Sequence, residues 1–522
     1  MFSVVKFKEL TVRQKEALLW GVFFIIFGLA VFLRFFHLGT NDFWCDEAVV
    51  VLQVQRFSQN SLVLPSKLFQ LYADFMYSWT SLFGTGEFSF RVPSVIFSCL
   101  ALWLLFQVAR KHFSRSVAFY ATTLMCFSSF GVWYAQEARP YSLVSFLAIA
   151  SVYLFLEFME NRRQVSFLLL LVVSILGIHA HVCYVFLIIA QVVFFLFRMT
   201  VFFTRRNLLF LLFLVAGVLV CIPQITDFLK HFFHLKKGFW IPSPSFLSFP
   251  VTLKNFLFGY NLGISFSYFA GILIALLAVY SLYFSVTVRH NQKTTVLGIF
   301  FIVPFVVCYA ISYMFFPVYL DRLLITVFPV FFLLLAIVLC SIRSNVFRNV
   351  VFFSLIFLQL CGIQAYFMNE MPANEGWRHV GVHLKKTIKK PLAYLKENVQ
   401  KEDGIAFASP ASVPSFFCYG FLTLPVQGRF FLYKEGDLFD VLQRPIKENK
   451  VLLEMPLRNV PLEKIVGLSC KKLWVISNDW ERTGNLRSEK TVRTIKKYMD
   501  AHFNRVSEKE FDGLFISCYL LK

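Results

Sequence analysis

Charged side chains are scarce in this sequence. Asp, Glu, Lys and Arg make up 16% of its 522 residues, whereas 58% of the residues are hydrophobic. Soluble globular domains average about 25% charged residues, so this composition excludes an ordinary soluble protein. It predicts a polytopic α-helical membrane protein.

Several motifs that mark other kinds of function are missing. The 11 cysteines form no CxxC pair and no Cys/His zinc spacing, so we expect neither a metal cluster nor a disulfide framework. The sequence has no GxxxxGK loop and no Rossmann fingerprint, and nothing visible in it requires a cofactor or a metal. We explain the net charge of +21 by basic cytoplasmic loops that lie near anionic lipid, and not by binding to nucleic acid.

Long hydrophobic runs dominate the first two thirds of the chain. A helix needs about 20 apolar residues to cross a bilayer, and this criterion predicts about eleven transmembrane helices. The predicted spans are residues 19–36, 91–109, 117–134, 141–158, 165–181, 182–203, 207–225, 264–287, 294–315, 322–341 and 347–367. Residues 1–18 are polar and basic and no small-residue cleavage site follows, so we interpret the first run as a retained span.

Basic loops alternate with loops that are not basic. The basic ones are residues 111–115, 160–164, 204–207, 289–293 and 341–349. The positive-inside rule places these loops and the N-terminus in the cytoplasm. The segments that then face outward are residues 37–90, 135–140, 226–263 and 316–321 and the stretch after residue 368.

Two of the outward segments are long. Residues 37–90 contain two stretches, 46–57 and 67–83, that are typical of amphipathic helices near the interface. The tail is rich in Lys and Glu, and its short alternating runs predict a small α/β domain. The strand-like runs are residues 404–409, 429–433 and 472–477, and a helical stretch covers residues 376–388. We expect a transmembrane domain over residues 1–368 and an extracytoplasmic C-terminal domain over residues 369–522.

Ionisable and aromatic-polar residues gather on the predicted outward side. The candidates are Asp46, Glu47, Arg91, Arg139, Tyr141, His181, Trp240 and Arg322. Ionisable groups at membrane depth are costly, and such groups are therefore functional candidates. Residues that are far apart in sequence but share one membrane face suggest a single cavity.

Each candidate also has a purely structural interpretation. The acids at 46–47 can cap a juxtamembrane helix, because carboxylates favour helix N-termini. Arg139 can anchor to lipid headgroups, and Arg322 can pair with Asp321. For His181 we favour the interpretation of a satisfied core histidine. Trp240 suits an aromatic belt, and Tyr141 suits interfacial packing.

A set of motifs occurs in a fixed order along the chain. Arg34 precedes WCDEA at 44–48, and the later motifs are FGTGEFSFRVPSVIF (83–97), QEARPYSL (136–143), FWIPSPS (239–245), PVYLDRLLITVFP (317–329) and EGWRHVGVHL (375–384). Together these motifs resemble those of glycosyltransferase family 39 and the aminoarabinose transferases, membrane enzymes with the GT-C fold. The resemblance covers about residues 30–390, and the EARPY segment is similar to the bacterial branch of the group.

The sequence departs from the family pattern at two places. LFQLYA at 68–73 stands where members carry HPPLYY, so the His and the proline pair are absent. Arg322 is followed by Leu323, whereas members carry Tyr there.

The resemblance implies that a sugar is transferred from a polyprenyl-phosphate-linked donor to an acceptor, with inversion at the anomeric carbon. The acceptor class, lipid A, protein or another surface glycan, stays open. The implied site is at the outer face of a bacterial inner membrane. Asp46 is the expected general base, and Glu47 orients it or binds acceptor. Arginine suits the donor phosphate, and the expected donor-side residues are Arg139, Arg322, Arg91, Arg34, Tyr141, Trp240 and His181.

Two alternatives remain at this point. A transporter or flippase for a lipid-linked glycan also places charges in a membrane cavity, but it usually shows internal repeats or charged broken helices at the midplane. A catalytically degenerate homologue is favoured by the missing HPP and disfavoured by the intact DEA and ARPY segments.

Overall fold

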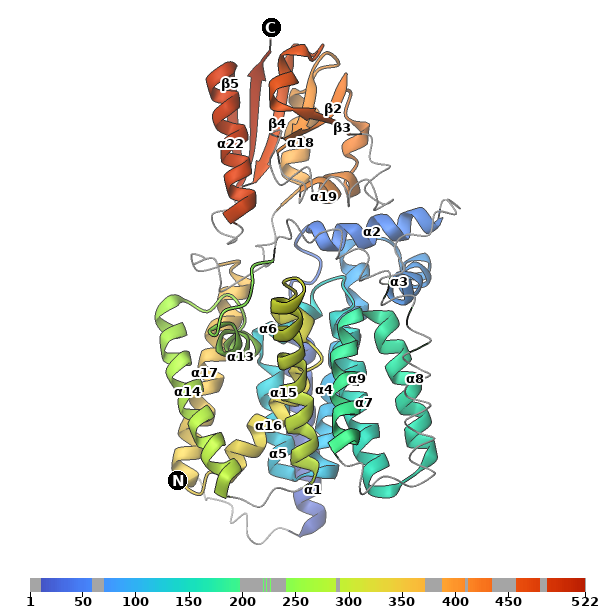
Figure 1. The fold of residues 1–522 in the computed structure, drawn as a ribbon, viewed down its shortest axis with the longest axis vertical. Coiled ribbons are helices and arrows are strands. Elements are labelled where there is room, and N and C mark those ends of the chain that lie inside the picture. Colours follow the sequence, from blue (N-terminus) through green and yellow to red (C-terminus); the bar gives the residue numbers. More distant parts are fainter. Residues whose placement is uncertain are drawn as a thin grey trace.

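A helical bundle carries a small sheet domain at one end (Figure 1). The structure is a computed structural model. It describes residues 11–58, 70–197, 241–287, 292–370, 387–408, 412–433, 457–478 and 486–521, together with Leu219, Ile222 and Thr226.

Long apolar helices form the bundle and confirm the polytopic helical fold. Among the described residues, six are long and apolar enough to cross a membrane: α1 (Val12–Phe35), α4 (Glu87–His112), α7 (Tyr141–Asn161), α14 (Ile264–Thr287), α15 (Gln292–Met314) and α17 (Asn345–Phe367). The bent pair α5 (Arg115–Cys126) and α6 (Ser129–Ala135) adds a seventh, and α8 (Gln164–Ala180), α9 (Val185–Phe197) and α16 (Phe328–Ser341) are shorter apolar helices. Apart from Leu219 and Ile222, the predicted span at 207–225 lies outside the described residues, so the number eleven stays a prediction.

The predicted span at 117–134 is broken in the structure. Helix α5 ends at Cys126 and α6 starts at Ser129, with a 61° bend between the two. The side chain of Ser128 begins the new helix: it accepts the Gly131 N–H at 3.1 Å and donates to the Phe256 carbonyl at 2.7 Å. Serine is a strong N-cap residue, and a hydropathy window does not detect this signal.

Three further helices lie at the end of the bundle that faces the sheet domain. They are α2 (Cys45–Ser58), α3 (Gln70–Phe83) and α13 (Ser248–Phe258). Helices α2 and α3 match the predicted amphipathic stretches, whereas α13 was not predicted. Helix α13 packs closely on α17 at Gly362. This close approach requires glycine, since a Cβ atom there would collide with the Phe258 carbonyl oxygen.

The C-terminal part forms a mixed six-stranded sheet in the order β3-β2-β1-β4-β6-β5. Its strands are β1 (Gly404–Phe407), β2 (Gly428–Tyr433), β3 (Arg458–Pro461), β4 (Lys472–Asn478), β5 (Asn504–Phe511) and β6 (Leu514–Leu520). The first four are parallel, and β6 and β5 are antiparallel additions. The predicted runs became β1, β2 and β4, and most of the helical stretch at 376–388 lies outside the described residues.

Helices cover both faces of this sheet. Ile405 and Phe407 point to the face covered by α18 (Lys389–Asn398) and α19 (Val413–Cys418). Ala406 points to the opposite face, which α22 (Leu486–His502) covers. This alternation follows from the two-residue period of a strand. The predicted α/β domain is therefore present.

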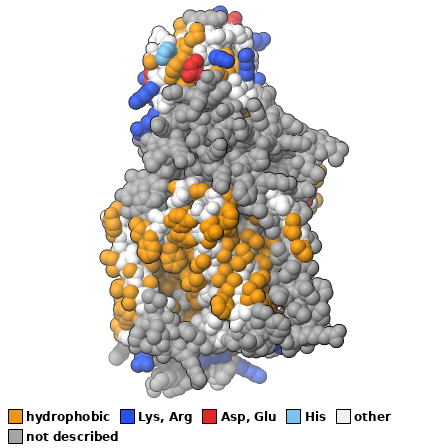
Figure 2. Space-filling model, in the orientation of Figure 1, with side chains coloured by type: hydrophobic (Ala, Val, Ile, Leu, Met, Phe, Trp, Pro, Cys, Tyr) orange, Lys and Arg blue, Asp and Glu red, His pale blue; other side chains and the backbone are white. Residues whose placement is uncertain are grey.

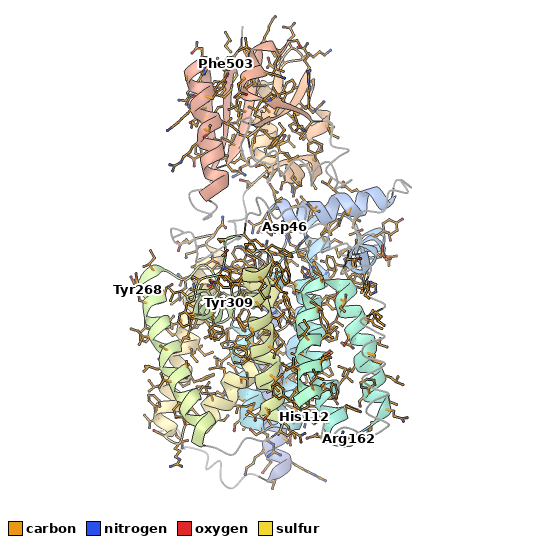
Figure 3. All side chains as sticks on the ribbon, in the orientation of Figure 1. Asp46, His112, Arg162, Tyr268, Tyr309 and Phe503 are labelled. Atoms are coloured by element: carbon orange, nitrogen blue, oxygen red, sulfur yellow. The ribbon has the colours of Figure 1, made fainter. Side chains whose placement is uncertain are left out.

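The described parts of the basic loops gather at the end of the bundle opposite the sheet. His112 and Arg162 lie there, whereas Asp46 lies at the junction with the sheet domain (Figure 3). Glu16 pairs with Arg115 at 2.6 Å across this end. The flank of the bundle between the two ends is covered by hydrophobic side chains, and Lys and Arg lie beyond it at both ends (Figure 2).

Candidate functional site

Asp46 and Glu47 lie in the first turn of α2, at the junction between the bundle and the sheet domain (Figure 3). Carboxylates in the first helical turn are favourable because the helix dipole is positive there. The two neighbours have different surroundings.

Glu47 forms a fully buried ion pair with Arg91 of α4. The Arg91 Nε donates to Glu47 Oε1 at 2.8 Å, and its Nη2 donates to Oε2 at 2.8 Å. Glu47 also accepts the Ala138 N–H at 2.9 Å and the Trp44 N–H at 3.4 Å. The last contact is half of a capping box. Glu47 therefore ties together α2, α4 and the loop before α7.

Arg91 has every donor occupied by protein. Beyond its two bonds to Glu47, it donates to the carbonyl oxygens of Leu38 at 3.0 Å, Asn41 at 2.8 Å and Asp42 at 3.2 Å. A guanidinium has five N–H donors, so these contacts use them all. In this geometry Arg91 cannot contact a donor phosphate as expected, because no N–H is left for it.

Asp46 is partly open to solvent, with 29% of its side chain exposed. The Arg322 Nη2 lies 3.9 Å from Asp46 Oδ2, and Arg139 donates from Nη1 to the Asp46 carbonyl at 3.3 Å. Two of the arginines that we expected on the donor side therefore lie next to Asp46, the expected general base. The loose contact leaves Asp46 lone pairs in reach of a proton on an incoming group.

Cys45 precedes Asp46 and is not a competing nucleophile. Burial raises the pKa of the Cys45 thiol well above its usual value, and the neighbouring Asp46 raises it further. A thiol reacts as the thiolate, and this direction of the pKa shift disfavours the thiolate form of Cys45.

Arg34 lies away from Asp46, at the break between α5 and α6. Its Nε donates to Ser98 at 2.8 Å, and Nη1 donates to the carbonyls of Ala30 at 3.1 Å and Cys126 at 3.3 Å. The last carbonyls of a helix have no partner within the helix. Arg34 supplies partners for the end of α5, so its geometry fits support of the helix break better than the predicted contact to substrate.

Tyr141 and His181 lie next to the two arginines. The guanidinium carbon of Arg139 is 5.6 Å from the centre of the Tyr141 ring, and the His181 ring is 5.6 Å from the same ring. The Nδ1 atom of His181 accepts the Cys183 N–H at 3.1 Å. This bond assigns the proton of a neutral His181 to Nε2. Trp240, the remaining candidate, lies outside the described residues.

Helix α13 contributes polar groups that sequence analysis did not single out. Thr252 donates to Asp321 Oδ1 at 2.5 Å, and the Asn255 amide donates to Oδ2 at 2.6 Å. Burial raises the pKa of Asp321, while these two hydrogen bonds act in the opposite direction. The alternative interpretation, in which Arg322 pairs with Asp321, does not describe the main contacts of Asp321, and Arg322 Nη2 lies 3.9 Å from Asp46.

Glu137 of the EARPY segment is buried and was also missed as a separate residue. It accepts the indole N–H of Trp133 at 2.6 Å. Nothing in the sequence signals this contact, because it depends on how α6 ends one turn after Trp133.

Three potential metal ligands meet at the other end of the bundle. Ligand atoms of His112, Glu157 and Glu160 lie within 4.8 Å of one another. Lys111 lies 2.6 Å from Glu157, and Lys293 contacts Glu160, so the two carboxylates already have cationic partners. This network fits a tie between helix ends better than a metal site.

Known proteins share this fold. Residues 71–226 match the family model described as dolichyl-phosphate-mannose-protein mannosyltransferase. No curated protein sequence matches the chain. ArnT from Cupriavidus metallidurans in the apo state is 10% identical, with a TM-score of 0.60 over 96% of this chain and 98% of that chain.

Two similar structures contain a polyprenyl phosphate. ArnT from the same organism bound to undecaprenyl phosphate is 11% identical, with a TM-score of 0.57 over 96% of this chain and 98% of that one. The archaeal oligosaccharyltransferase AglB from Archaeoglobus fulgidus, in complex with an inhibitory peptide and a dolichol-phosphate, is 11% identical, with a TM-score of 0.54 over 97% of this chain and 74% of that one. The chain thus has the GT-C membrane fold, and its residues 71–226 match the dolichyl-phosphate-mannose-protein mannosyltransferase family, as the motifs implied.

Proposed function

We propose that this protein transfers a sugar from a polyprenyl-phosphate-linked donor to an acceptor hydroxyl or phosphate. The observation that carries the proposal is the meeting of a partly exposed carboxylate, Asp46, with Arg139 and Arg322 at one end of the bundle. The family match and the polyprenyl phosphates in two similar structures support this donor class. The acceptor class is lipid A, protein or another surface glycan.

The chemistry is a direct displacement at the anomeric carbon. Asp46 takes the proton from the acceptor oxygen as that oxygen bonds to the carbon, an effect worth about 10²–10⁴-fold in rate. The bond between the carbon and the donor phosphate breaks, and the lipid phosphate leaves with the electron pair. Arg139 and Arg322 stabilise the charge that develops on this phosphate. Attack opposite the leaving group inverts the anomeric centre.

Tyr141 and His181 complete the donor side. Tyr141 packs against the Arg139 guanidinium and His181 against Tyr141, so both hold the shape of the phosphate site. Glu47 acts through position, because its oxygens are used by Arg91, Ala138 and Trp44.

The site faces outward from a bacterial inner membrane in this proposal. The basic loops support the orientation, because their described parts lie at the end opposite Asp46. The proposed division is a transmembrane domain over residues 1–368 and an extracytoplasmic domain over residues 369–522. A Lys390→Cys variant should react with an impermeant maleimide in intact cells, whereas Arg163→Cys should react only after lysis. Both positions are exposed in the structure, and equal labelling of both would contradict this orientation.

One assay separates the proposed function from its alternatives. Membranes with and without the protein are incubated with radiolabelled polyprenyl-phosphate sugar, and surface glycolipids and proteins are analysed by mass spectrometry. We expect consumption of the donor and a new sugar on one acceptor class. Movement of intact donor across the bilayer without transfer would indicate a flippase. If the protein shows neither sugar transfer nor movement of donor, it is a catalytically degenerate homologue.

A further inference from the structure

Four side chains join the sheet domain to the catalytic end of the bundle. Asp42 lies in the segment before α2, Glu87 is the first residue of α4, Lys389 begins α18 and Tyr419 follows α19. We call this set the interdomain clasp.

Asp42 caps a helix of the other domain. Its Oδ2 accepts the N–H groups of Ile388 at 2.6 Å and Lys389 at 2.9 Å, at the start of α18. The first N–H groups of a helix have no partner within the helix, and a carboxylate at the N-terminus also suits the helix dipole. Asp42 is buried. The segment that leads into α2 is therefore anchored to α18.

Lys389 and Tyr419 close the clasp from the sheet domain. The Lys389 Nζ lies 3.4 Å from Asp42 Oδ1, also contacts Glu87, and stands 5.1 Å from the centre of the Tyr419 ring. The Tyr419 hydroxyl accepts the Phe43 N–H at 2.8 Å and donates to Glu87 Oε1 at 2.9 Å. One hydroxyl thus bridges the backbone before α2 and the first residue of α4.

These contacts hold both elements that position Asp46, the proposed general base. Phe43 lies three residues before Asp46, and farther along α2 the Cys418 thiol donates to the Ala48 carbonyl at 3.3 Å. Glu87 lies one turn before Arg91, which holds Glu47. The sheet domain therefore contacts the chain on both sides of Asp46, and it also contacts α4, whose Arg91 binds Glu47.

We propose that Lys389 and Tyr419 are positioning residues for sugar transfer: the sheet domain holds α2 so that Asp46 meets the acceptor oxygen in line with the donor. This inference rests on the proposed function. Neither residue touches the reacting atoms. Their effect follows from geometry, because a shift of about 1 Å in a catalytic group costs about 10²-fold in rate.

The test uses the full-length protein and removes one contact at a time. Tyr419→Phe deletes the bridging hydroxyl, and Lys389→Met removes the cation but keeps an unbranched apolar chain. We expect each to lower kcat about tenfold or more, with the KM for donor within about twofold of the wild-type value. Lys389→Arg, which keeps the cation, should recover most of the rate.

Matched controls separate positioning from general loss of stability. Tyr394→Phe removes a hydroxyl from α18 of the same domain, and Lys390→Met removes the next lysine, which makes none of the clasp contacts. Both controls should retain wild-type kcat. Thermal unfolding of all variants should stay close to wild type.

Hydrogen exchange gives a readout that does not depend on activity. Amides of residues 42–50 should exchange faster in Tyr419→Phe and Lys389→Met than in wild type, while those of α7 stay unchanged. Wild-type kcat or unchanged exchange at residues 42–50 in both variants would overturn the positioning role. A wild-type protein that transfers no sugar would instead overturn the proposed function, and the exchange result would still report on the clasp.

Discussion

Asp46 and Glu47 are neighbours in the chain, but the Glu47 carboxylate is buried and the Asp46 carboxylate is partly exposed to solvent. Glu47 is fully buried and bonded twice to Arg91 at 2.8 Å. Asp46 has 29% of its side chain exposed and lies 3.9 Å from Arg322. Both pairs join a carboxylate to an arginine, but only the first has the geometry of a close bidentate pair.

This difference between the two pairs suggests a structural role for one and a catalytic role for the other. A buried pair with all its hydrogen bonds made fixes three segments in place, and removing one partner leaves an uncompensated charge. A loose, partly hydrated pair costs little to rearrange and leaves an oxygen in reach of a proton. Under the proposed function, the pair at Glu47 has a structural role and the pair at Asp46 takes part in catalysis. Variants of each pair can test that division.

Asp46→Asn should have the largest effect on transfer. The substitution keeps the size of the side chain and removes the base, so we expect the rate to fall by about 10²–10⁴-fold. Donor binding and thermal stability should stay near wild type, because Asn caps a helix about as well as Asp. Initial rates with labelled donor check this. Near-normal transfer would make Asp46 a capping residue and would remove the contrast with Glu47.

Arg322→Ala and Arg139→Ala should come next. Each removes a partner of the leaving phosphate, and we expect transfer to fall by about 10²–10³-fold. Arg322→Lys should recover only part of the rate, because Lys lacks the planar fork of Arg. Arg505→Ala, in the exposed part of the sheet domain, is the control. Wild-type turnover of donor by both alanine variants would rule out the phosphate roles.

Glu47→Gln should affect stability more than chemistry. It leaves the Arg91 charge buried without its partner, and breaking such a pair costs about 3–5 kcal/mol. Transfer should fall in proportion to the folded fraction, as measured by thermal unfolding and by rate per folded molecule. The double variant Glu47→Gln/Arg91→Met should recover only part of the stability, because the carbonyls of Leu38, Asn41 and Asp42 then lose the donor that Arg91 supplies. A stable Glu47→Gln protein with no activity would show instead that Glu47 takes part in the chemistry.

Lys111→Met, at the other end of the bundle, should have the smallest effect. Its ion pair with Glu157 at 2.6 Å uses a lysine side chain that is 45% exposed. Glu157 itself is only 7% exposed, but it keeps His112 at 3.2 Å as a neighbour. We therefore expect stability to change by about 1 kcal/mol or less, and the rate constant should stay at its wild-type value. A large drop in transfer would mean that this end of the bundle is coupled to Asp46.

Sequence analysis predicted the elements that depend on local pattern. The apolar runs that fall within the described residues became helices, and the alternating runs at 404–409, 429–433 and 472–477 became strands of one sheet. The gathering of Asp46, Arg139 and Arg322 at one end followed from the alternation of basic loops. These signals are local or additive along the chain, so one sequence is enough to read them.

Pairings between distant residues could not be predicted. Arg91 and Glu47 are 44 residues apart, and nothing in the motif order distinguishes a buried partner from a ligand of phosphate. Strand β5 is mostly exposed and lies at the edge of the sheet, so its sequence lacks the apolar alternation of a half-buried strand. The break between α5 and α6 depends on Ser128 and on Phe256 from another helix.

Arg34 also constrains the order in which the helices assemble. Its carbonyl partner at Cys126 is 92 residues away, so α1 is synthesised long before that partner exists. An arginine at the centre of an inserting helix costs about 2.5–3.5 kcal/mol, but one near a helix end can extend its side chain to the membrane surface. A newly inserted α1 would therefore keep Arg34 hydrated until Ser98 of α4 and then the end of α5 arrive. Docking of α1 on the broken span then buries the charge and commits the first helix to its final depth.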